Sequence, residues 1–174
     1  QGDACSQHTL GVLYEQGFSS QKANIKEAVK WLTKSADQGY DMAQERLFEM
    51  YYDGDGVPKD YEKAIKWIKE IAKNDKHDSG AQYQLAMMYE NGEGVTKDYK
   101  QMIKWLIKAA ENDSKQAQMN LGVIYYHGDK GALKDYKEAV KWFEKAAEAE
   151  DSLFESFNTW AQEKLAGMYY RGEG

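Results

Sequence analysis

Apolar and polar residues alternate along this chain in a pattern that returns at a nearly fixed interval. A leucine followed four residues later by a tyrosine occurs at Leu10/Tyr14, Leu47/Tyr51, Leu85/Tyr89, Leu121/Tyr125 and Leu165/Tyr169, and a second motif ends at Trp31, Trp67, Trp105 and Trp142. The tyrosines lie 37, 38, 36 and 44 residues apart, and the tryptophans 36, 38 and 37. Self-similarity at this period predicts a solenoid, in which each repeat is one supersecondary unit.

Each repeat carries two stretches of helical periodicity, as the second repeat illustrates. Its first apolar stripe consists of Ala43, Leu47, Met50 and Tyr51. Gly54-Asp55-Gly56 then interrupts the pattern. Asp60 is the predicted N-cap of the next helix, because its carboxylate can accept hydrogen bonds from first-turn amides. The second apolar stripe consists of Tyr61, Ala64, Ile65, Ile68, Ile71 and Ala72. The pattern therefore predicts an all-α fold built from helix pairs.

The position after the repeated leucine is small in most repeats. It is occupied by Gly11, Ala86, Gly122 and Ala166. A small residue there lets the paired helix approach closely, and we expect the exception, Phe48, to push its neighbours apart slightly. The repeated tyrosines and tryptophans are predicted to fill the space between successive helix pairs, because they bury a large area with few rotamers to lose.

These motifs resemble a known repeat family. The string Ala81-x-x-x-Leu85-Ala86-x-x-Tyr89-x-x-Gly92-x-Gly94-Val95-x-x-Asp98, followed by Trp105 and Ala109-Ala110, resembles the Sel1-like repeat, a helix hairpin related to the tetratricopeptide repeat. The resemblance implies an all-α, right-handed α/α superhelix (a solenoid) whose first helices line a concave groove. It also implies a role as adaptor or scaffold, often in secreted or envelope proteins of bacteria and in endoplasmic-reticulum quality control in eukaryotes. The resemblance alone favours a periplasmic or secreted location.

The repeats are expected at residues 4–39, 40–78, 79–113 and 114–149, with a partial fifth at 159–174. The turns at residues 17–24 and 128–132 are one residue longer than the others. Residues 150–158 form an insertion with Leu153, Phe154 and Phe157, which we expect to pack back onto the stack or to form a binding tip; packing is favoured because exposed apolar patches are rare. Neither end carries a polar cap, so the chain is predicted to be a fragment of a longer protein.

Composition narrows the classes of function. With 23 basic and 29 acidic residues the net charge is −6, which disfavours a nucleic-acid partner. The apolar share of 42% and the aromatic share of 13% argue against intrinsic disorder. No apolar run reaches the length needed to insert in a membrane. The single cysteine, Cys5, excludes an intramolecular disulfide.

The resemblance also indicates where a ligand would bind. In tetratricopeptide-like repeats, groove positions lie on the first helix, offset from the leucine and tyrosine that contact the core. The corresponding residues are His8, Val12, Glu15 and Gln16; Glu45, Glu49, Tyr52 and Asp53; Tyr83, Met87, Glu90 and Asn91; Met119, Val123, Tyr126 and His127; and Glu163, Tyr170 and Arg171. One column, which we call the groove column, reads Glu15, Tyr52, Glu90, Tyr126 and Tyr170. A groove with acidic and tyrosine side chains is predicted to accept an extended or helical peptide with some positive charge.

The second helices carry lysines at three- and four-residue steps. These are Lys26, Lys30 and Lys34; Lys63, Lys66 and Lys69; Lys100, Lys104 and Lys108; and Lys137, Lys141 and Lys145. This spacing predicts a solvated ridge on the convex side, which keeps the protein soluble.

The sequence offers little catalytic or metal-binding chemistry. Ser19-x-x-Lys22 matches a string of β-lactamases and penicillin-binding proteins, but their other motifs are missing and the string lies in a turn, so we interpret it as a chance match. His8, His77 and His127 lie in different repeats without ligand spacing, and no metal or cofactor is predicted. Asp53-Gly54-Asp55-Gly56 begins like a calcium loop but is followed by Ala64 where the loop requires glutamate.

The leading hypothesis is a non-catalytic scaffold or adaptor that binds a protein or peptide in its groove, with other domains of a parent chain as further partners. The first alternative is a structural spacer within a larger envelope or secreted protein. The second is penicillin-binding or hydrolase activity that uses Ser19 and Lys22.

Overall fold

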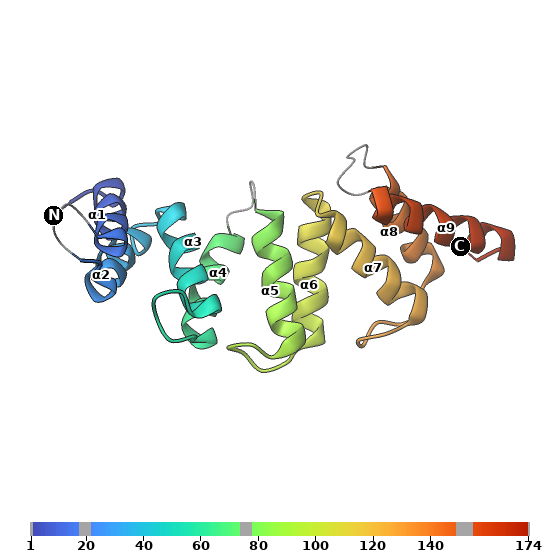
Figure 1. Cartoon of the computed structure of the whole chain (residues 1–174). Coiled ribbons are helices and arrows are strands. Elements are labelled where there is room, and N and C mark those ends of the chain that lie inside the picture. The colour runs from blue at the N-terminus through green and yellow to red at the C-terminus, as the bar shows by residue number, and fades with distance from the viewer. Residues whose placement is uncertain (1, 18–21, 74–77, 149–154, 174) are drawn as a thin grey trace. The chain divides into compact units, whose positions relative to one another are not determined.

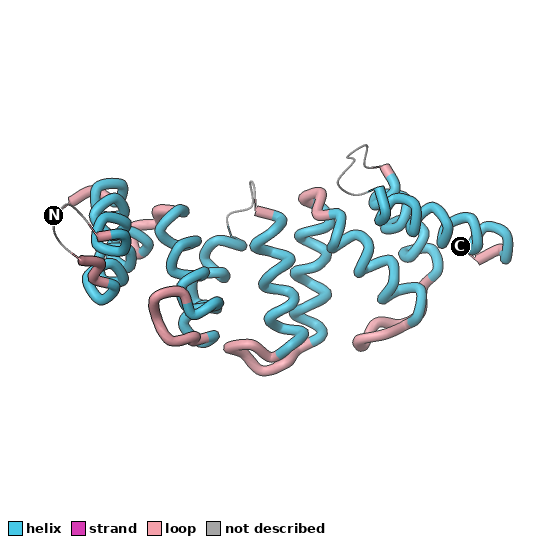
Figure 2. The backbone as a smooth tube through the Cα atoms, in the orientation of Figure 1, coloured by secondary structure: helices cyan, strands magenta, loops and turns pink. Residues whose placement is uncertain are grey.

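The computed structural model describes residues 2–17, 22–73, 78–148 and 155–173, and the regular structure in these ranges is helical (Figures 1 and 2). The helices are α1 (Ala4–Gln16), α2 (Ile25–Ala36), α3 (Asp41–Glu49), α4 (Tyr61–Lys73), α5 (Ser79–Asn91), α6 (Tyr99–Glu111), α7 (Lys115–His127), α8 (Tyr136–Ala147) and α9 (Glu155–Arg171). A π-helical segment, η1 (Met50–Gly54), continues α3. The predicted all-α class is thereby confirmed.

The chain forms two compact units, each a series of helices packed on their neighbours in sequence. The N-terminal unit comprises Gln1–Asp75 together with the loop Gly92–Thr96, and the C-terminal unit comprises the remainder. Within the first unit α1 packs on α2, α2 on α3 and α3 on α4; within the second the same order runs from α5 to α9. Contacts between neighbours in sequence are those expected of helix-pair repeats.

The repeated leucines form much of the core, and the repeated aromatic residues are buried to different degrees. Leu47, Leu85 and Leu121 are fully buried, whereas Leu10 in α1 is only half-buried. Of the four tryptophans in the repeated motif, Trp67 and Trp142 are buried, and Trp31 and Trp105 are half-buried. Tyr169 of the last repeat is exposed. The predicted role of the aromatic residues as core is therefore borne out for Trp67 and Trp142, whereas the repeated tyrosines are half-buried or, at Tyr169, exposed.

Each second helix begins with the same arrangement of hydrogen bonds. The Asp60 carboxylate accepts from the Lys63 amide at 3.0 Å, as predicted, and Asp98 and Asp135 cap α6 and α8 in the same way. The amide of each capping residue also donates to the carbonyl of the repeat's tyrosine. The pairs are Asn24 to Tyr14 (2.7 Å), Asp60 to Tyr51 (2.8 Å), Asp98 to Tyr89 (3.0 Å) and Asp135 to Tyr125 (2.9 Å). The extra residue in the first and fourth turns is accommodated without loss of this bond.

The small position after the leucine is a site of close helix approach, as predicted. A Cβ atom on Gly122 would lie 2.3 Å from Cε1 of Phe143, and one on Gly11 would lie 2.7 Å from Cγ of Leu32. In the repeat that carries Phe48 instead, the phenyl ring stacks on Tyr52 at 5.1 Å, and the wider π-helical turn begins two residues later.

A column of buried glutamines was not predicted from the sequence, and two of its members link successive repeats. Gln7, Gln44, Gln82 and Gln118 all lie three residues before the repeated leucine and are buried. Nε2 of Gln44 donates to the Ala36 carbonyl at 3.1 Å, and Nε2 of Gln118 donates to the Ala110 carbonyl at 2.9 Å. These carbonyls lie in the last turn of the preceding helix, where no intrahelical donor is available. Gln44 and Gln118 therefore bind the end of the preceding helix, whereas Gln7 donates to the Gly2 carbonyl and Gln82 accepts from Asn112.

We expect Gln118→Leu to lower the free energy of unfolding by about 0.5–1.5 kcal/mol, because the Ala110 carbonyl would lose its shorter hydrogen bond and keep only the one from the Asp113 amide, at 3.3 Å, while side-chain volume is kept. Urea unfolding followed by circular dichroism measures the change. Gln162→Leu is the matched control, since Gln162 holds the same repeat position in α9 but is exposed. The control should change the free energy of unfolding by less than about 0.5 kcal/mol. Equal losses in the two variants would contradict a stabilising role for the buried glutamine.

The predicted lysine ridge also covers the tryptophans. Nζ of Lys34 lies 4.2 Å from the ring centroid of Trp31, and Nζ of Lys66 lies 4.0 Å from that of Trp67. Lys108 over Trp105 and Lys141 over Trp142 repeat the contact in the C-terminal unit. Each cation–π contact contributes about 0.5–1 kcal/mol at such exposed sites, so these lysines also stabilise the packing of the tryptophans.

Candidate functional site

A cavity of about 450 Å³ lies in the N-terminal unit between the first helices of its two repeats. Its lining consists of His8, Val12, Glu15 and Gln16 from α1 and Met42, Glu45, Arg46 and Glu49 from α3. The residues placed in the groove from sequence in these two repeats are thus brought together, apart from Tyr52 and Asp53. Met42 and Arg46 are additions that the sequence analysis did not select.

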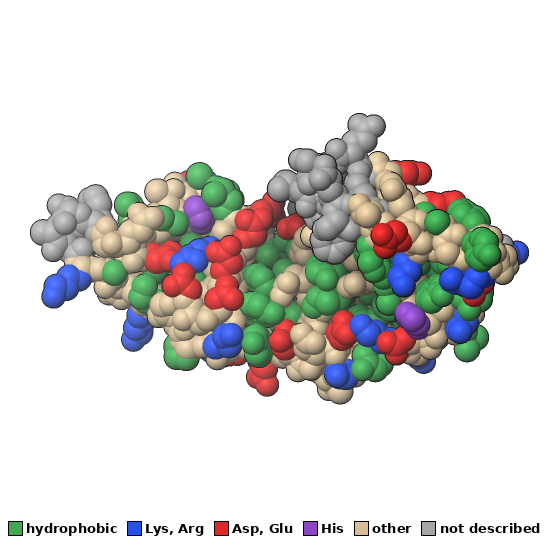
Figure 3. All heavy atoms as spheres, turned by 45° about the vertical axis from the view of Figure 1, so that its right-hand side comes forward, with side chains coloured by type: hydrophobic (Ala, Val, Ile, Leu, Met, Phe, Trp, Pro, Cys, Tyr) green, Lys and Arg blue, Asp and Glu red, His purple; other side chains and the backbone are tan. Residues whose placement is uncertain are grey.

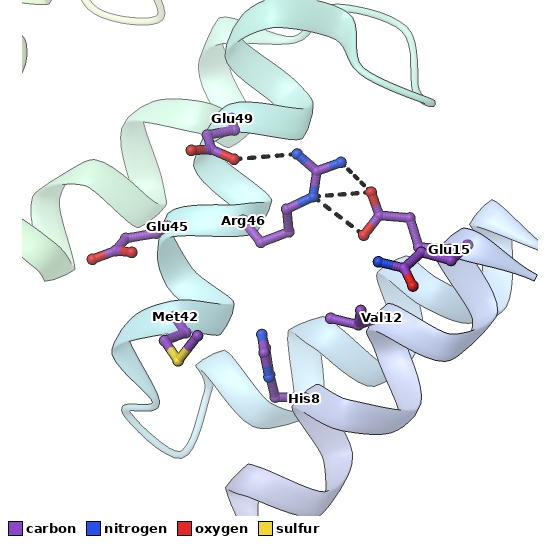
Figure 4. A pocket seen from close by; sticks show the side chains of 8 residues that line it. His8, Val12, Glu15, Met42, Glu45, Arg46 and Glu49 are labelled. Atoms are coloured by element: carbon purple, nitrogen blue, oxygen red, sulfur yellow. Dashed lines mark hydrogen bonds and ion pairs between the residues drawn. The ribbon is translucent and has the colours of Figure 1, made fainter.

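Arg46 is the centre of an ion cluster at one end of the cavity (Figure 4). Its Nε donates to both carboxylate oxygens of Glu15, at 2.9 and 3.2 Å, and its Nη2 also contacts Glu15. Nη1 donates to Glu49 at 3.2 Å, and Nη2 donates to Asp55 at 2.6 Å. The contact with Glu15 is the main reason that the pKa of the Arg46 guanidinium is raised above its ordinary value.

The cluster is more acidic than basic. Arg46 is matched by Glu15, Glu49 and Asp55, and Glu45 lines the same cavity with its carboxylate pointing away from the guanidinium (Figure 4). Four carboxylates and one guanidinium leave a net charge of −3. In the space-filling view, acidic side chains gather around basic ones beside a histidine on this unit (Figure 3). Because every nitrogen of the guanidinium already donates to a carboxylate, the site favours a cationic group over an anionic one.

The other end of the cavity is lined by less charged and more apolar side chains. Met42 is 56% exposed, an unusual degree for a methionine, and it lies near His8 and Val12 (Figure 4). The imidazole of His8 lies 5.1 Å from the ring of Tyr40, whose hydroxyl lies 3.5 Å from Sδ of Met42. A flexible thioether beside an aromatic pair is a surface that adapts to apolar ligand groups.

Tyr52 and Asp53 lie outside this cavity, in η1. The hydroxyl of Tyr52 donates to Oε2 of Glu93 at 3.2 Å, and its ring lies 5.3 Å from that of Tyr61. Asp53 is exposed. Tyr52 is therefore a contact between the first helix of its repeat and the turn of the next.

The predicted residues of the C-terminal unit are engaged in similar contacts. Lys130 pairs with Glu90 at 2.5 Å, and Asn120 donates to the hydroxyl of Tyr83 at 3.2 Å. Arg171 donates to the hydroxyl of Tyr126 at 2.9 Å.

Four of the five residues in the groove column thus bind a residue of the following repeat. The pairs are Glu15 with Arg46, Tyr52 with Glu93, Glu90 with Lys130, and Tyr126 with Arg171. Acidic residues in the column bind a cation, and tyrosines bind a charged group through the hydroxyl. The column therefore fixes successive repeats to one another as well as lining their surface.

The remaining predicted residues differ in accessibility. The prediction that Met119 lines the groove is wrong. Its side chain is only 8% exposed and packs in a core cluster with Phe143 and Ala161. Met87 and Val123 are half-buried and pack against core clusters. Exposed positions are Asn91, His127, Glu163, Tyr170 and Arg171.

Other chemistry anticipated from the sequence falls partly outside the described residues. Ser19 and the side chains of Leu153, Phe154 and Phe157 lie there, although α9 begins at Glu155 and so includes the end of the insertion. Lys22 is exposed. Among the described side chains, no three His, Cys, Asp or Glu residues are grouped so as to hold a metal ion. Within the same ranges, no helix combines the length and apolarity needed to cross a membrane.

Comparison with known proteins shows a match along most of the chain. The family model described as Sel1 repeat matches residues 6–40, 41–76, 79–114 and 115–151. Putative sel1-like repeat-containing protein L18 of Acanthamoeba polyphaga mimivirus is 54% identical over 37 residues, which are 21% of this chain and 6% of that protein. Protein L21 of the same virus is 36% identical over 72 residues, 41% of this chain and 13% of that protein.

Two solved structures are similar over nearly the whole chain. A Sel1 repeat protein from Oxalobacter formigenes has a TM-score of 0.74 at 30% identity, covering 98% of this chain and 66% of its own. A protective antigen of uropathogenic Escherichia coli strains, described as displaying an SLR fold, has a TM-score of 0.72 at 35% identity, covering 99% of this chain and 35% of its own. These structures confirm the predicted solenoid class. This chain spans less than two thirds of the length of each of these four relatives.

Proposed function

The chain belongs to the Sel1 repeat family, and we propose that it is a non-catalytic scaffold that binds a positively charged segment of a protein or peptide between its first helices. Sel1-repeat proteins are typically non-catalytic and mediate protein interactions. The observation that supports the finer proposal is the cavity between α1 and α3, whose carboxylates outnumber its one guanidinium. A protein-lined groove with net negative charge is complementary to lysine or arginine side chains.

The spacer alternative is supported by a different observation. The groove column makes contacts between repeats, so its charged and hydroxyl groups would stabilise the stack even without a ligand. The two functions differ in what a surface charge reversal does: a spacer tolerates it, whereas a binding groove loses its ligand.

Binding of a basic peptide tests the proposal. We expect a fluorescein-labelled Gly/Ser peptide with two arginines to bind the whole chain at low salt, and its glutamine counterpart to bind at least about tenfold more weakly. Fluorescence anisotropy measures both affinities. High salt should weaken the arginine peptide selectively, because exposed charges are screened.

A pair of matched variants locates the binding. Glu49→Lys should weaken the arginine peptide about tenfold, since it reverses a charge at the cavity. Glu70→Lys is the control: Glu70 is also an exposed glutamate in an i,i+3 ion pair, with Lys73, but it lies on the second helix α4. Equal sensitivity of the two variants, or equal binding of the two peptides, would contradict the groove function. Tyr52 and Tyr126 are less suitable probes because their substitution also removes contacts between repeats.

A further inference from the structure

The cavity between α1 and α3 has two chemically different ends, arranged in the same order on both helices. Along α1 the lining residues run from His8 through Val12 to Glu15, and along α3 they run from Met42 to Glu49. In α1 the carboxylate of Glu15 comes seven residues after His8, and in α3 the carboxylate of Glu49 comes seven residues after Met42. Figure 4 shows Met42 and His8 together at one end and the ion cluster of Arg46 at the other. A ligand along the cavity would therefore meet an apolar region and an acidic region in sequence.

The separation of the two ends sets the spacing of the ligand. Seven residues of α-helix rise about 10 Å. In an extended peptide, side chains two residues apart point to the same side and are separated by about 7 Å. A long basic side chain leaning toward the carboxylates covers the remaining distance. Adjacent residues point to opposite sides of an extended chain and cannot enter the cavity together.

Resting on the function proposed above, we propose that the cavity recognises an extended peptide segment in which one basic and one apolar residue stand two positions apart. The basic side chain, an arginine or lysine, binds beside Glu45 and Glu49 at the acidic end. The apolar side chain packs on Met42 and Val12. The cavity volume of about 450 Å³ fits two side chains of this size rather than a folded domain.

The hydrogen bonds of Arg46 make the cavity select basic over acidic ligand residues. Its guanidinium is held by Glu15, Glu49 and Asp55, so it cannot turn to bind a carboxylate on the ligand without breaking those bonds. An acidic residue in the ligand would approach four carboxylates and find no free cation within this cluster. Segments with aspartate or glutamate in place of the basic residue are therefore rejected.

Five labelled Gly/Ser peptides test the spacing by fluorescence anisotropy on the whole chain. They contain Arg-Ser-Leu, Leu-Ser-Arg, Arg-Leu, Arg-Ser-Ser or Glu-Ser-Leu. We expect one of the first two to bind about three- to tenfold more tightly than both the adjacent pair and the arginine-only peptide, and the glutamate peptide to bind weakest. The stronger of the first two gives the direction of the bound chain. An adjacent pair that binds as tightly as the spaced pairs would overturn the inference.

Two variants test which end of the cavity binds the apolar side chain and which binds the basic one. Met42→Ser, at an exposed side chain, should remove the advantage of the leucine peptide while leaving the arginine-only peptide unchanged. Glu49→Gln should weaken every arginine peptide, with Glu70→Gln as the control that weakens none. If leucine adds nothing but Glu49→Gln still weakens arginine binding, only the two-part site fails. If no peptide binds, or none responds to Glu49→Gln, the groove function itself fails.

Discussion

Gly94→Ala is expected to lower the free energy of unfolding by roughly 2–5 kcal/mol. Gly94 has a φ of +68°, and a Cβ atom there would lie 2.0 Å from the carbonyl oxygen of Tyr61, the first residue of α4. The left-handed backbone costs an alanine about 1–2 kcal/mol. The overlap adds about 1–3 kcal/mol, because it falls on backbone that cannot rotate away as a side chain would.

The cost of the clash can be separated from the cost of the backbone. Gly39 has a similar φ of +81°, but no atom lies within 4 Å of the position its Cβ would take. Gly39→Ala should therefore lose only the backbone part, about 1–2 kcal/mol. Urea unfolding of both variants gives the difference. Equal losses of unfolding free energy in the two variants would show that the turn at Gly94 does not pack closely on α4.

Gly94 shows what the Gly-x-Gly turn does in the stack. The second glycine of the second repeat, Gly56, likewise lies against Ile25, the first residue of α2, with a Cβ-to-Cδ1 distance of 3.2 Å. In the fourth repeat, whose turn is one residue longer, Gly131 has no atom within 4 Å. The sequence indicated these glycines as helix breakers. Their contact with the start of the preceding repeat's second helix depends on how repeats stack, which the spacing of a single repeat does not contain.

Features that repeat locally were predictable from the sequence. The cap at Asp60, the buried Leu47 and Leu121, and the small residue at Gly122 each follow from helix periodicity or from the steric need of one helix pair. Glu15, Glu45 and Glu49, which the resemblance to tetratricopeptide-like repeats placed in the groove, line one cavity; that a ligand binds there stays a prediction.

Features that depend on contacts between repeats were not predictable in this way. Arg46 was not selected, although Glu45, Arg46 and Glu49 form an acidic helix segment with one basic residue at i,i+3 spacing. Met119 was misplaced because the groove position of the fourth repeat is covered by α9: its core cluster includes Ala161 and Leu165. The 44-residue interval before Tyr169 left the register of α9 against α7 open. Side-chain pairing across such an interval is decided by packing, not by periodicity.

Phe143→Ala is expected to lower the free energy of unfolding by about 3–5 kcal/mol, the usual range for a buried phenylalanine. Phe143 is 1% exposed, fills the space opposite Gly122 and meets Trp160 edge-to-face at 5.5 Å. Gly122→Ala alone should also be destabilising, by about 1–3 kcal/mol, because its Cβ would overlap the Phe143 ring at 2.3 Å.

The double variant is the decisive measurement, because the effect of Gly122→Ala should change sign. Without the Phe143 ring the three atoms nearest to the methyl group are removed, and alanine stabilises a helix by about 1 kcal/mol relative to glycine. The Gly122→Ala/Phe143→Ala protein should thus be more stable than Phe143→Ala alone by up to about 1 kcal/mol. The coupling energy from the double-mutant cycle is the difference between this gain and the loss that Gly122→Ala causes on its own. Gly167→Ala in α9 is the matched control: its Cβ would meet only the flexible end of Arg171, at 3.2 Å, so it should be neutral or stabilising with or without Phe143. Additive losses in the cycle would contradict the steric role of Gly122. The close approach of α7 and α8 would then not depend on a small residue after the leucine.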